Sequence, residues 1–177
     1  MALNWNEIKD RALKFSKEWE GTFNEDADAK SFLDAFFNVF GIDRRRVATF
    51  EHRVKKLDDA DGYIDLLWKG VILIEMKSRG KNLEKAFEQS KLYIHGLKEH
   101  ELPKYILVSD FEKFKIFDTE EGKTSEFLLK DLYKHVNLLG YLAGYIKREY
   151  KEQDPVNIKA AELMGKLHDR LEEIGYK

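Results

Sequence analysis

The sequence predicts an α/β fold in which a central mixed sheet is flanked by helices. Two amphipathic helical patterns, rich in phenylalanine and tryptophan, occupy the first forty residues. A strand follows at Val71–Lys77, and its segment Val71–Ile74 is apolar on both faces, as is typical of a central strand in an α/β sheet. A helical pattern separates this strand from another apolar strand at Lys104–Ser109. Such a crossover is right-handed and places the two strands parallel.

Helices are predicted towards both ends of the chain. Apolar residues spaced by three and four indicate an N-terminal helical pair over Trp5–Glu20 and Ala27–Phe40, each followed by a glycine that ends it. C-terminal helices are expected at about 130–151 and 155–174, with Pro155 at the first position of the last one. The aromatic residues of the N-terminal pair are expected to build the core.

Weaker patterns complete the sheet. Strands are expected within Val47–Val54 and Phe114–Phe117. Asn82 is a suitable N-cap for the helix that lies between the two apolar strands. The predicted order from residue 47 onwards is therefore three strands, a helix and two strands.

Composition excludes several classes of protein. The chain has 177 residues, 43% of them hydrophobic, and no cysteine, which excludes a wholly disordered chain, a disulfide scaffold, a thiolate zinc site and a cysteine nucleophile. There is no secretion signal, no apolar run of 18 residues and no glycine-rich phosphate loop, so a cytoplasmic protein without a membrane span or an ATP-driven motor is expected. The net charge of −2 hides a segment, residues 44 to 85, with a net charge of +4.

This positive segment contains a hairpin that carries three charged residues. The hairpin is predicted from Tyr63–Trp68 and Val71–Lys77. Residues two apart on a strand share a face, so Glu75 and Lys77 project together. The turn decides whether Asp65 joins them, because a shift of one residue in register moves a side chain to the other face.

Two turns are compatible with the sequence. A two-residue turn at Lys69-Gly70 would place Asp65 on the face opposite Glu75. A three-residue loop over 68–70, with Gly70 left-handed, would pair Leu67 with Val71 and bring Asp65 onto the face of Glu75. We predict the three-residue loop.

Such a cluster suits a hard divalent cation. Carboxylate oxygens held close together attract Mg²⁺, and the cation offsets their mutual repulsion. A neighbouring lysine could orient or deprotonate a water molecule and offset charge in a phosphoryl-transfer transition state. The alternative is structural: Asp65 caps a turn, and Glu75 and Lys77 form an ion pair. Charges on a buried strand are costly, which favours the functional interpretation.

The motif Asp65, nine residues, Glu75-Met76-Lys77 resembles the PD-(D/E)XK nuclease signature. The wider pattern of a helical pair, Asp-Gly-Tyr-Ile-Asp at 61–65, Glu-Met-Lys and Tyr-Ile-Leu-Val-Ser-Asp-Phe at 105–111 is similar to the N-terminal endonuclease domain of MmeI-like type IIL restriction-modification enzymes. Ile64 stands where the signature usually has proline. The methyltransferase and target-recognition domains that follow in that family are absent from these residues.

The resemblance implies a PD-(D/E)XK restriction-endonuclease-like fold and assigns roles to the motif. Asp65, Glu75 and the backbone carbonyl of Met76 would bind Mg²⁺, or Mn²⁺, and Lys77 would be the catalytic lysine. Residues 1–150 would form the nuclease domain, with a core at about 44–118, and 151–177 a connector to a methyltransferase. S-adenosylmethionine would bind only to that absent part.

Further residues are candidates for positioning the substrate. Gln89 and Tyr93 share a helix face and resemble the Gln-x-x-x-Tyr element of RecB-like nucleases, although an ordinary helix pair is an equal alternative. Ser78 directly follows the motif. Glu51 and Asp61 are second-tier acidic candidates, for which an exposed strand carboxylate and a turn residue are the simpler interpretations.

Basic residues around the motif are candidate contacts to the DNA backbone, although most basic runs are merely solvated. They are Arg44, Arg45, Arg46, Arg53, Lys55, Lys56, Arg79 and Lys81. Such contacts would position DNA without reading its sequence.

The expected function is that of a Mg²⁺-dependent DNA endonuclease domain of a type II restriction-modification enzyme, acting on double-stranded DNA. It would leave 5′-phosphate and 3′-hydroxyl ends. One alternative is a stand-alone resolvase or repair nuclease, and another is an inactive DNA-binding or scaffold module with the same fold. Because cutting both strands needs two sites or two events, a homodimer on DNA is a further expectation.

Overall fold

The computed structural model describes residues 3–145, 163–168, 170 and 175. Contacts divide the chain into two units, Met1–Tyr145 and Ile146–Lys177. The first unit contains the sheet, the helices that cover it and the motif residues. The expected boundary after residue 150, and the role of the second unit as a connector, stay predictions.

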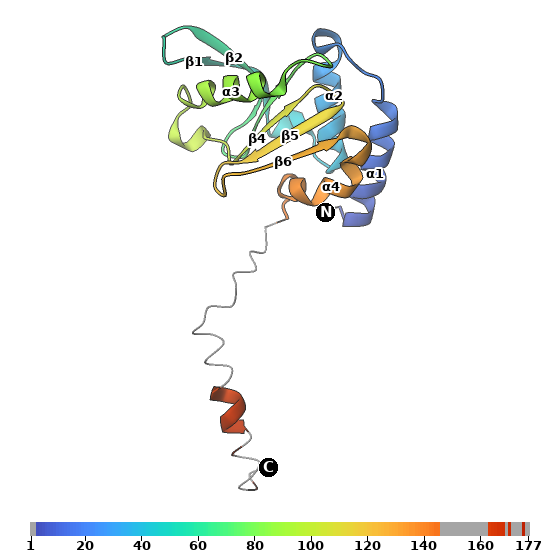
Figure 1. Cartoon of the computed structure of the whole chain (residues 1–177), viewed down its shortest axis with the longest axis vertical. Coiled ribbons are helices and arrows are strands. Elements are labelled where there is room, and N and C mark those ends of the chain that lie inside the picture. Colours follow the sequence, from blue (N-terminus) through green and yellow to red (C-terminus); the bar gives the residue numbers. More distant parts are fainter. Residues whose placement is uncertain (1–2, 146–162, 169, 171–174, 176–177) are drawn as a thin grey trace. The chain divides into compact units, whose positions relative to one another are not determined.

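The first unit is built on a six-stranded mixed sheet (Figure 1). The strands lie in chain order, and only β3 and β4 are parallel. They are β1 (Thr49–Lys55), β2 (Asp61–Trp68), β3 (Ile72–Met76), β4 (Tyr105–Ser109), β5 (Lys113–Asp118) and β6 (Lys123–Leu128). The predicted α/β fold with a helix-flanked mixed sheet and parallel apolar strands is confirmed.

Helices cover both faces of the sheet. Helices α1 (Trp5–Glu18) and α2 (Glu25–Val39) pack with one face through a core rich in phenylalanine. Helix α3 (Leu83–Ile94) packs on the other face through a smaller core. Asparagine side chains cap all three helices, because they accept bonds from the otherwise unpaired N–H groups of the first turn.

Residues of the smaller core define which side of the sheet faces α3. They are Val54, Ile64, Leu67, Leu73, Ala86, Phe87, Tyr93, Ile106 and Val108. Leu66, Ile74 and Met76 belong instead to the core beneath α1 and α2.

Some predicted boundaries are wrong. Helix α2 begins at Glu25 rather than Ala27, because Asn24 caps it. The helix expected at 130–151 is, in its described part, a series of short helices: η3 (Leu129–Asp131), α4 (Leu132–His135) and η4 (Val136–Ala143). Gly144, with φ of 81°, ends the series. Residues 146–150 lie outside the described residues.

Other short elements complete the description. The 3₁₀ helices η1 (Arg44–Arg46) and η2 (Glu99–Glu101) precede β1 and β4. Of the helix expected at 155–174, the described residues 163–168 are helical, and Pro155 lies outside the described residues. No helix among the described residues has the length and apolar character that crossing a membrane requires.

The β2–β3 loop has the predicted odd length but a different register. Trp68 pairs with Ile72, so the loop is Lys69–Val71, and the predicted pairing of Leu67 with Val71 is wrong. Gly70 is left-handed as predicted, with φ of 73°. The register differs because the Val71 carbonyl accepts hydrogen bonds from the N–H groups of residues 104 and 105 at the start of β4, at 3.0 and 3.1 Å.

The end of α3 is fixed against the hairpin of β1 and β2 by a close backbone contact. A Cβ at Gly96 would lie 2.1 Å from the carbonyl oxygen of Lys55. Because this neighbour is backbone rather than a movable side chain, any larger residue must displace β1.

Substitution Gly96→Ala is therefore expected to destabilise the fold by about 1–3 kcal/mol. Urea unfolding followed by circular dichroism measures the change. Gly165→Ala is the matched control, since a Cβ there meets nothing within 4 Å. Equal stability of the two variants would contradict the close contact.

Candidate active site

The candidate site lies where β2 and β3 separate. Their ladder covers only residues 66–68 of β2, whereas β2 pairs with β1 along nearly its whole length. Beyond the ladder, side chains bridge the two strands. The Met76 N–H donates to Asp65 Oδ2 at 2.7 Å, and the Asp65 N–H donates to Glu75 Oε1 at 3.3 Å. These two bonds bring the two predicted carboxylates together.

The regular alternation of β2 is broken at this point. The ladder with β1 pairs Phe50 with Leu66 and His52 with Ile64, and omits the intervening residues Glu51 and Asp65. Glu51 has a φ of 52°, which is unusual for a residue with a side chain. On either side of the break, Ile64 faces α3 and Leu66 faces α1 and α2. The side of the sheet on which Asp65 lies therefore cannot be deduced from the two-residue alternation of the strand.

Glu75 is almost completely buried, with 1% of its surface exposed. Burial, followed by the neighbouring charge of Asp65, raises the pKa of its carboxyl to about 8 against the opposing effect of Lys77. Burial also raises the pKa of Asp65, although the hydrogen bond from the Met76 N–H opposes this shift. Without a cation, therefore, the pair resists carrying two negative charges.

Lys77 lies between two carboxylates. Its Nζ is 3.7 Å from Glu75 Oε2 and 3.6 Å from Glu25 Oε1. Burial favours the neutral amine, but the charges of Glu75, Glu25 and Asp65 outweigh it and raise the pKa of Lys77. Lys77 is therefore an ammonium group, a form that can donate hydrogen bonds and offset negative charge but cannot accept a proton.

Glu25 is a site residue that the sequence analysis missed. Its carboxylate accepts a hydrogen bond from the Ser78 N–H at 3.0 Å, and its own N–H donates to Ser78 Oγ at 3.4 Å. This reciprocal contact joins the N-terminus of α2 to the residue after Lys77. An acidic residue in the first turn of a helix is common because of the helix dipole, so the sequence held no signal that singled out Glu25.

A cavity of about 220 Å³ opens beside Asp65. Four acidic residues line it, Glu25, Asp26, Glu51 and Asp65, together with Lys30 and apolar residues of α2 and β1. Glu51 is exposed and forms an ion pair with Lys30 at 3.1 Å. The cavity gives solvent and ligands access to Asp65 from the side of α2.

The donor set suits a magnesium ion that keeps part of its water shell. Among the described residues, no group of three or more His, Cys, Asp or Glu side chains has the geometry of a complete metal cage. Mg²⁺ is usually held by one or two carboxylates together with water and substrate phosphates, and Asp65 and Glu75 supply two carboxylates. A cation there would also relieve the repulsion that raises their pKa values.

Comparison with known proteins identifies the family of the chain. The family model described as "MmeI, N-terminal domain" matches residues 10–174. The chain belongs to the MmeI N-terminal domain family.

The two proteins compared below are much longer than this chain. The chain is 23% identical over 146 residues to DNA methyltransferase A of Bacillus subtilis (strain 168), a match that covers 81% of the chain and 16% of that protein. A cryo-EM structure of a DrdV–DNA complex shares its fold, with a TM-score of 0.52 at 14% identity, over 81% of this chain and 14% of that one. The chain therefore spans about one sixth of the curated relative.

Gln89 and Tyr93 lie on α3 and form a hydrogen bond with each other. The Gln89 side-chain amide donates to the Tyr93 hydroxyl. The Tyr93 ring is buried, and a Cβ at Gly62 of β2 would lie 2.6 Å from it. The pair thus packs beneath the hairpin of β1 and β2, and its role towards a substrate stays a prediction.

The predicted basic residues are divided among different partners. Arg44 bonds Asp34 at 2.7 Å and lies over the Phe50 ring. Of the others, Arg45 and Arg46 pair with Asp43, Arg53 and Lys55 pair with Asp61, Arg79 pairs with Glu112, and Lys56 lies over the Tyr93 ring. Lys81 is exposed. They do not form one patch of free cations.

Asp61 belongs to the ion pairs of the hairpin. The hydrogen bond from Arg53, followed by that from Lys55, lowers the pKa of Asp61 to about 2. Asp61 is therefore ionised throughout the neutral range and engaged by two cations.

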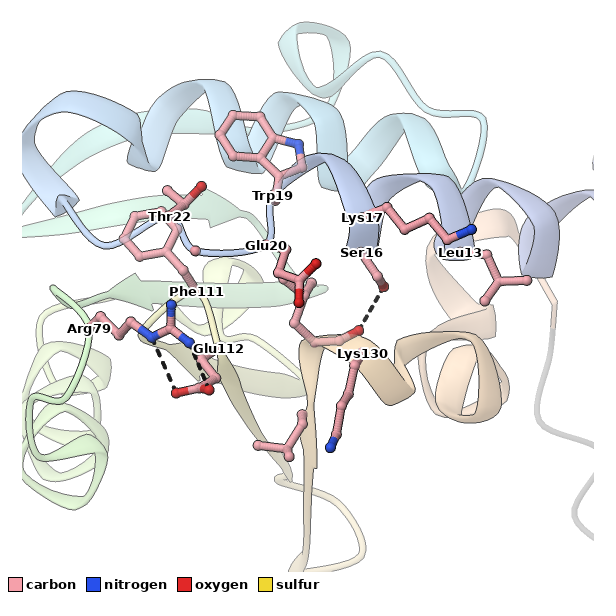
Figure 2. Close-up of a pocket in the computed structure, with 13 residues that line it drawn as sticks. Leu13, Ser16, Lys17, Trp19, Glu20, Thr22, Arg79, Phe111, Glu112 and Lys130 are labelled. Atoms are coloured by element: carbon pink, nitrogen blue, oxygen red, sulfur yellow. Dashed lines mark hydrogen bonds and ion pairs between the residues drawn. The ribbon is translucent and has the colours of Figure 1, made fainter.

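Another cavity, of about 280 Å³, lies between the end of α1, the loop after β3 and the start of η3 (Figure 2). Trp19 and Phe111 line it, and the Arg79–Glu112 ion pair, at 2.7 Å, closes one side. None of the three motif residues lines this cavity. It is therefore separate from the candidate active site.

Protonation of Glu75 makes the stability of the metal-free domain depend on pH. The folded-state pKa of about 8 lies above the ordinary value of 4.5, so the folded state holds this proton more tightly than the unfolded state. The stabilisation is fully present below pH 4.5 and is lost as the pH rises through 8. When a chelator keeps metal ions away, the free energy of unfolding is expected to fall as the pH rises from 4.5 through 8, by at most ~1.4 kcal/mol per pH unit.

Urea unfolding at a series of pH values between 5 and 9 measures this dependence. The substitution Glu75→Gln is expected to flatten it, whereas Glu88→Gln, at an exposed position on α3, leaves it unchanged. An equally steep dependence in the Glu75 variant would show that another group is responsible.

Proposed function

We propose that this chain is a Mg²⁺-dependent DNA endonuclease domain of a restriction-modification enzyme, with a PD-(D/E)XK site at Asp65, Glu75 and Lys77. The observation that carries the proposal is the pair of carboxylates bridging the separated strands, with the Lys77 ammonium 3.7 Å from Glu75. Two carboxylates can hold a divalent cation that assists phosphodiester hydrolysis, and a lysine can stabilise the charge that develops on the phosphoryl group.

The reaction is hydrolysis of a phosphodiester. A water oxygen forms a new bond to phosphorus, the bond from phosphorus to the 3′ oxygen breaks, and the 3′ oxygen leaves with a proton. The products are a 5′-phosphate and a 3′-hydroxyl. A divalent cation bound to Asp65 and Glu75 would polarise the phosphoryl oxygen and lower the pKa of a bound water molecule.

Each side chain has a part in this proposal. Asp65 and Glu75 hold the cation, with the Met76 backbone carbonyl as an additional oxygen ligand. Lys77 offsets the charge that develops on the phosphoryl oxygens, as its raised pKa favours the ammonium form. Glu25 holds Lys77 from the side of α2 and keeps Ser78 in place.

The relatives support the restriction-modification context. One is named a DNA methyltransferase, and the chain matches only 16% of its length. We infer that the domain works beside methyltransferase and target-recognition domains in a longer protein, where S-adenosylmethionine would bind. Double-stranded DNA is the proposed substrate, and a homodimer on DNA would allow both strands to be cut.

The proposal predicts loss of cleavage when the lysine is removed. In the longer protein that contains this domain, Lys77→Ala is expected to slow Mg²⁺-dependent plasmid cleavage about 10²–10³-fold, since charge stabilisation in the transition state is lost. Lys104→Ala is the matched control, as it removes an exposed lysine that belongs neither to the candidate site nor to the candidate DNA contacts. Undiminished cutting by the Lys77 variant would exclude the proposed site.

Assays of the 177-residue chain alone distinguish the two alternative functions. Structure-selective cutting of branched DNA by the 177-residue chain alone would favour a resolvase or repair nuclease. Absence of Mg²⁺ and Mn²⁺ binding in calorimetry, or binding unchanged in Asp65→Ala, would favour a scaffold that does not cut.

A further inference from the structure

The hairpin of β1 and β2 extends beyond the point where β2 leaves β3. Residues 53–55 of β1 and 61–63 of β2 pair only with each other, because the β2–β3 ladder begins at Leu66. Figure 1 shows this end of the hairpin reaching past the rest of the sheet alongside α3. The hairpin therefore has two faces that the other strands do not shield.

One of these faces is covered by α3. Val54 and Ile64 belong to the core that contains Phe87 and Tyr93 of α3. A Cβ at Gly62 would meet the Tyr93 ring at 2.6 Å, which shows how closely the helix approaches. The hairpin is thus held firmly on one side.

The opposite face is open. Arg53 lies across from Tyr63, and Lys55 lies across from Asp61. Tyr63 is 55% exposed although it is a large aromatic residue, and the Arg53 side chain is 62% exposed. Tyr63 of β2 thus lies beside Arg53 of β1, and tyrosine and arginine are enriched among the residues that contribute most to binding at interfaces.

This open face continues into the carboxylate site. Ile64 points towards α3, so Tyr63 points to the other side of the hairpin. Asp65 lines the cavity that residues Ala29 and Leu33 of α2 also line. A ligand lying on the open face therefore reaches Asp65 from the side of α2.

The charge of the face suits a polyanion. Arg53 and Lys55 share one carboxylate, that of Asp61, at 2.7 and 2.9 Å, so the paired strand residues of this face carry one positive charge in excess. The turn that joins the two strands adds Lys56, Asp58 and Asp59, and the Asp58 carboxylate accepts a hydrogen bond from the Ala60 N–H. Other cations of the segment are directed elsewhere: Arg44 towards Asp34, Arg79 towards Glu112 and Lys56 towards the Tyr93 ring. Of the basic residues that the sequence offered as DNA contacts, Arg53 and Lys55 are thus the ones that lie together on the open hairpin face.

We propose that duplex DNA lies on this open face, with its backbone against Arg53 and Lys55 and the Tyr63 ring against the duplex edge. The inference rests on the proposed function and adds the side from which a phosphodiester enters. Arg53 and Lys55 bind phosphates, and Tyr63 contributes contact area and a hydroxyl donor. Asp61 competes with the phosphates for the two cations and weakens binding.

Duplex binding by the 177-residue chain tests this surface. A fluorescein-labelled duplex is titrated in EDTA, so that nothing is cut, and anisotropy is recorded between 50 and 200 mM salt. Arg53→Ala is expected to weaken binding and to reduce the slope of log K against log salt by about 1. Tyr63→Ala is expected to weaken binding without changing the slope, because it removes no charge.

Asp61→Asn gives the sharpest result, since it is expected to tighten binding several-fold by freeing two cations. Lys104→Ala and Glu120→Gln are matched controls, because these residues form an exposed ion pair, at 3.5 Å, near the opposite end of β4. Both control variants are expected to bind the duplex within about twofold of the affinity of the unchanged chain, after correction for the change in net charge. The slope of log K against log salt is expected to stay close to that of the unchanged chain.

The outcomes separate the surface from the activity. Weaker or unchanged binding by Asp61→Asn, or control variants as effective as those of the hairpin, would overturn the surface. If Lys77→Ala abolishes cleavage but Arg53→Ala and Asp61→Asn leave duplex binding unchanged, the proposed DNA-binding surface is wrong and the proposed function stands. If binding follows the hairpin but Mg²⁺ never supports cutting, the surface stands and the proposed function fails. No binding to duplex at any salt concentration would overturn the surface directly.

Discussion

Two hydrogen bonds between side chains and backbone hold the centre of this domain together. Asp65 accepts the N–H of Met76, and Glu75 accepts the N–H of Asp65, at the point where the β2–β3 ladder ends. Buried backbone groups must be satisfied, and here carboxylates satisfy N–H groups that the neighbouring strand leaves unpaired. The separation of the strands therefore depends on the same residues that are proposed to do the chemistry. It also releases the far half of β2 to form a hairpin with β1.

The separation creates two regions of opposite charge. Around Lys77 lie the carboxylates of Glu25, Asp65 and Glu75, and burial makes this excess of negative charge costly. Among the paired strand residues of the open hairpin face, the two cations Arg53 and Lys55 outnumber the one carboxylate, that of Asp61. A polyanion attracted by the hairpin would be repelled at the carboxylates unless a cation lay between them. We therefore expect a bound divalent cation to strengthen DNA binding through electrostatics, without any change of fold.

The sequence predicted the helices, the central strands and the motif, because apolar periodicity and the cost of buried charge act locally. It did not predict β6, since this edge strand has a largely polar, exposed pattern. The loop register was predicted wrongly because the Val71 carbonyl is bound by the start of β4, more than thirty residues away. Glu25 was missed for the same reason: its partners Lys77 and Ser78 are remote in the sequence. The break at Glu51 and Asp65 likewise depends on strands meeting in three dimensions.

We expect Glu75 to give up a proton when a divalent cation binds at Asp65 and Glu75. Calorimetric titration of the 177-residue chain with Mg²⁺ at pH 7, in buffers of different ionisation enthalpy, measures the protons released. Because burial raises the pKa of Glu75 to about 8, release approaching one proton per bound ion is expected, and Glu75→Gln is expected to abolish it. Binding of Mg²⁺ without proton release, or release that persists in this variant, would contradict it.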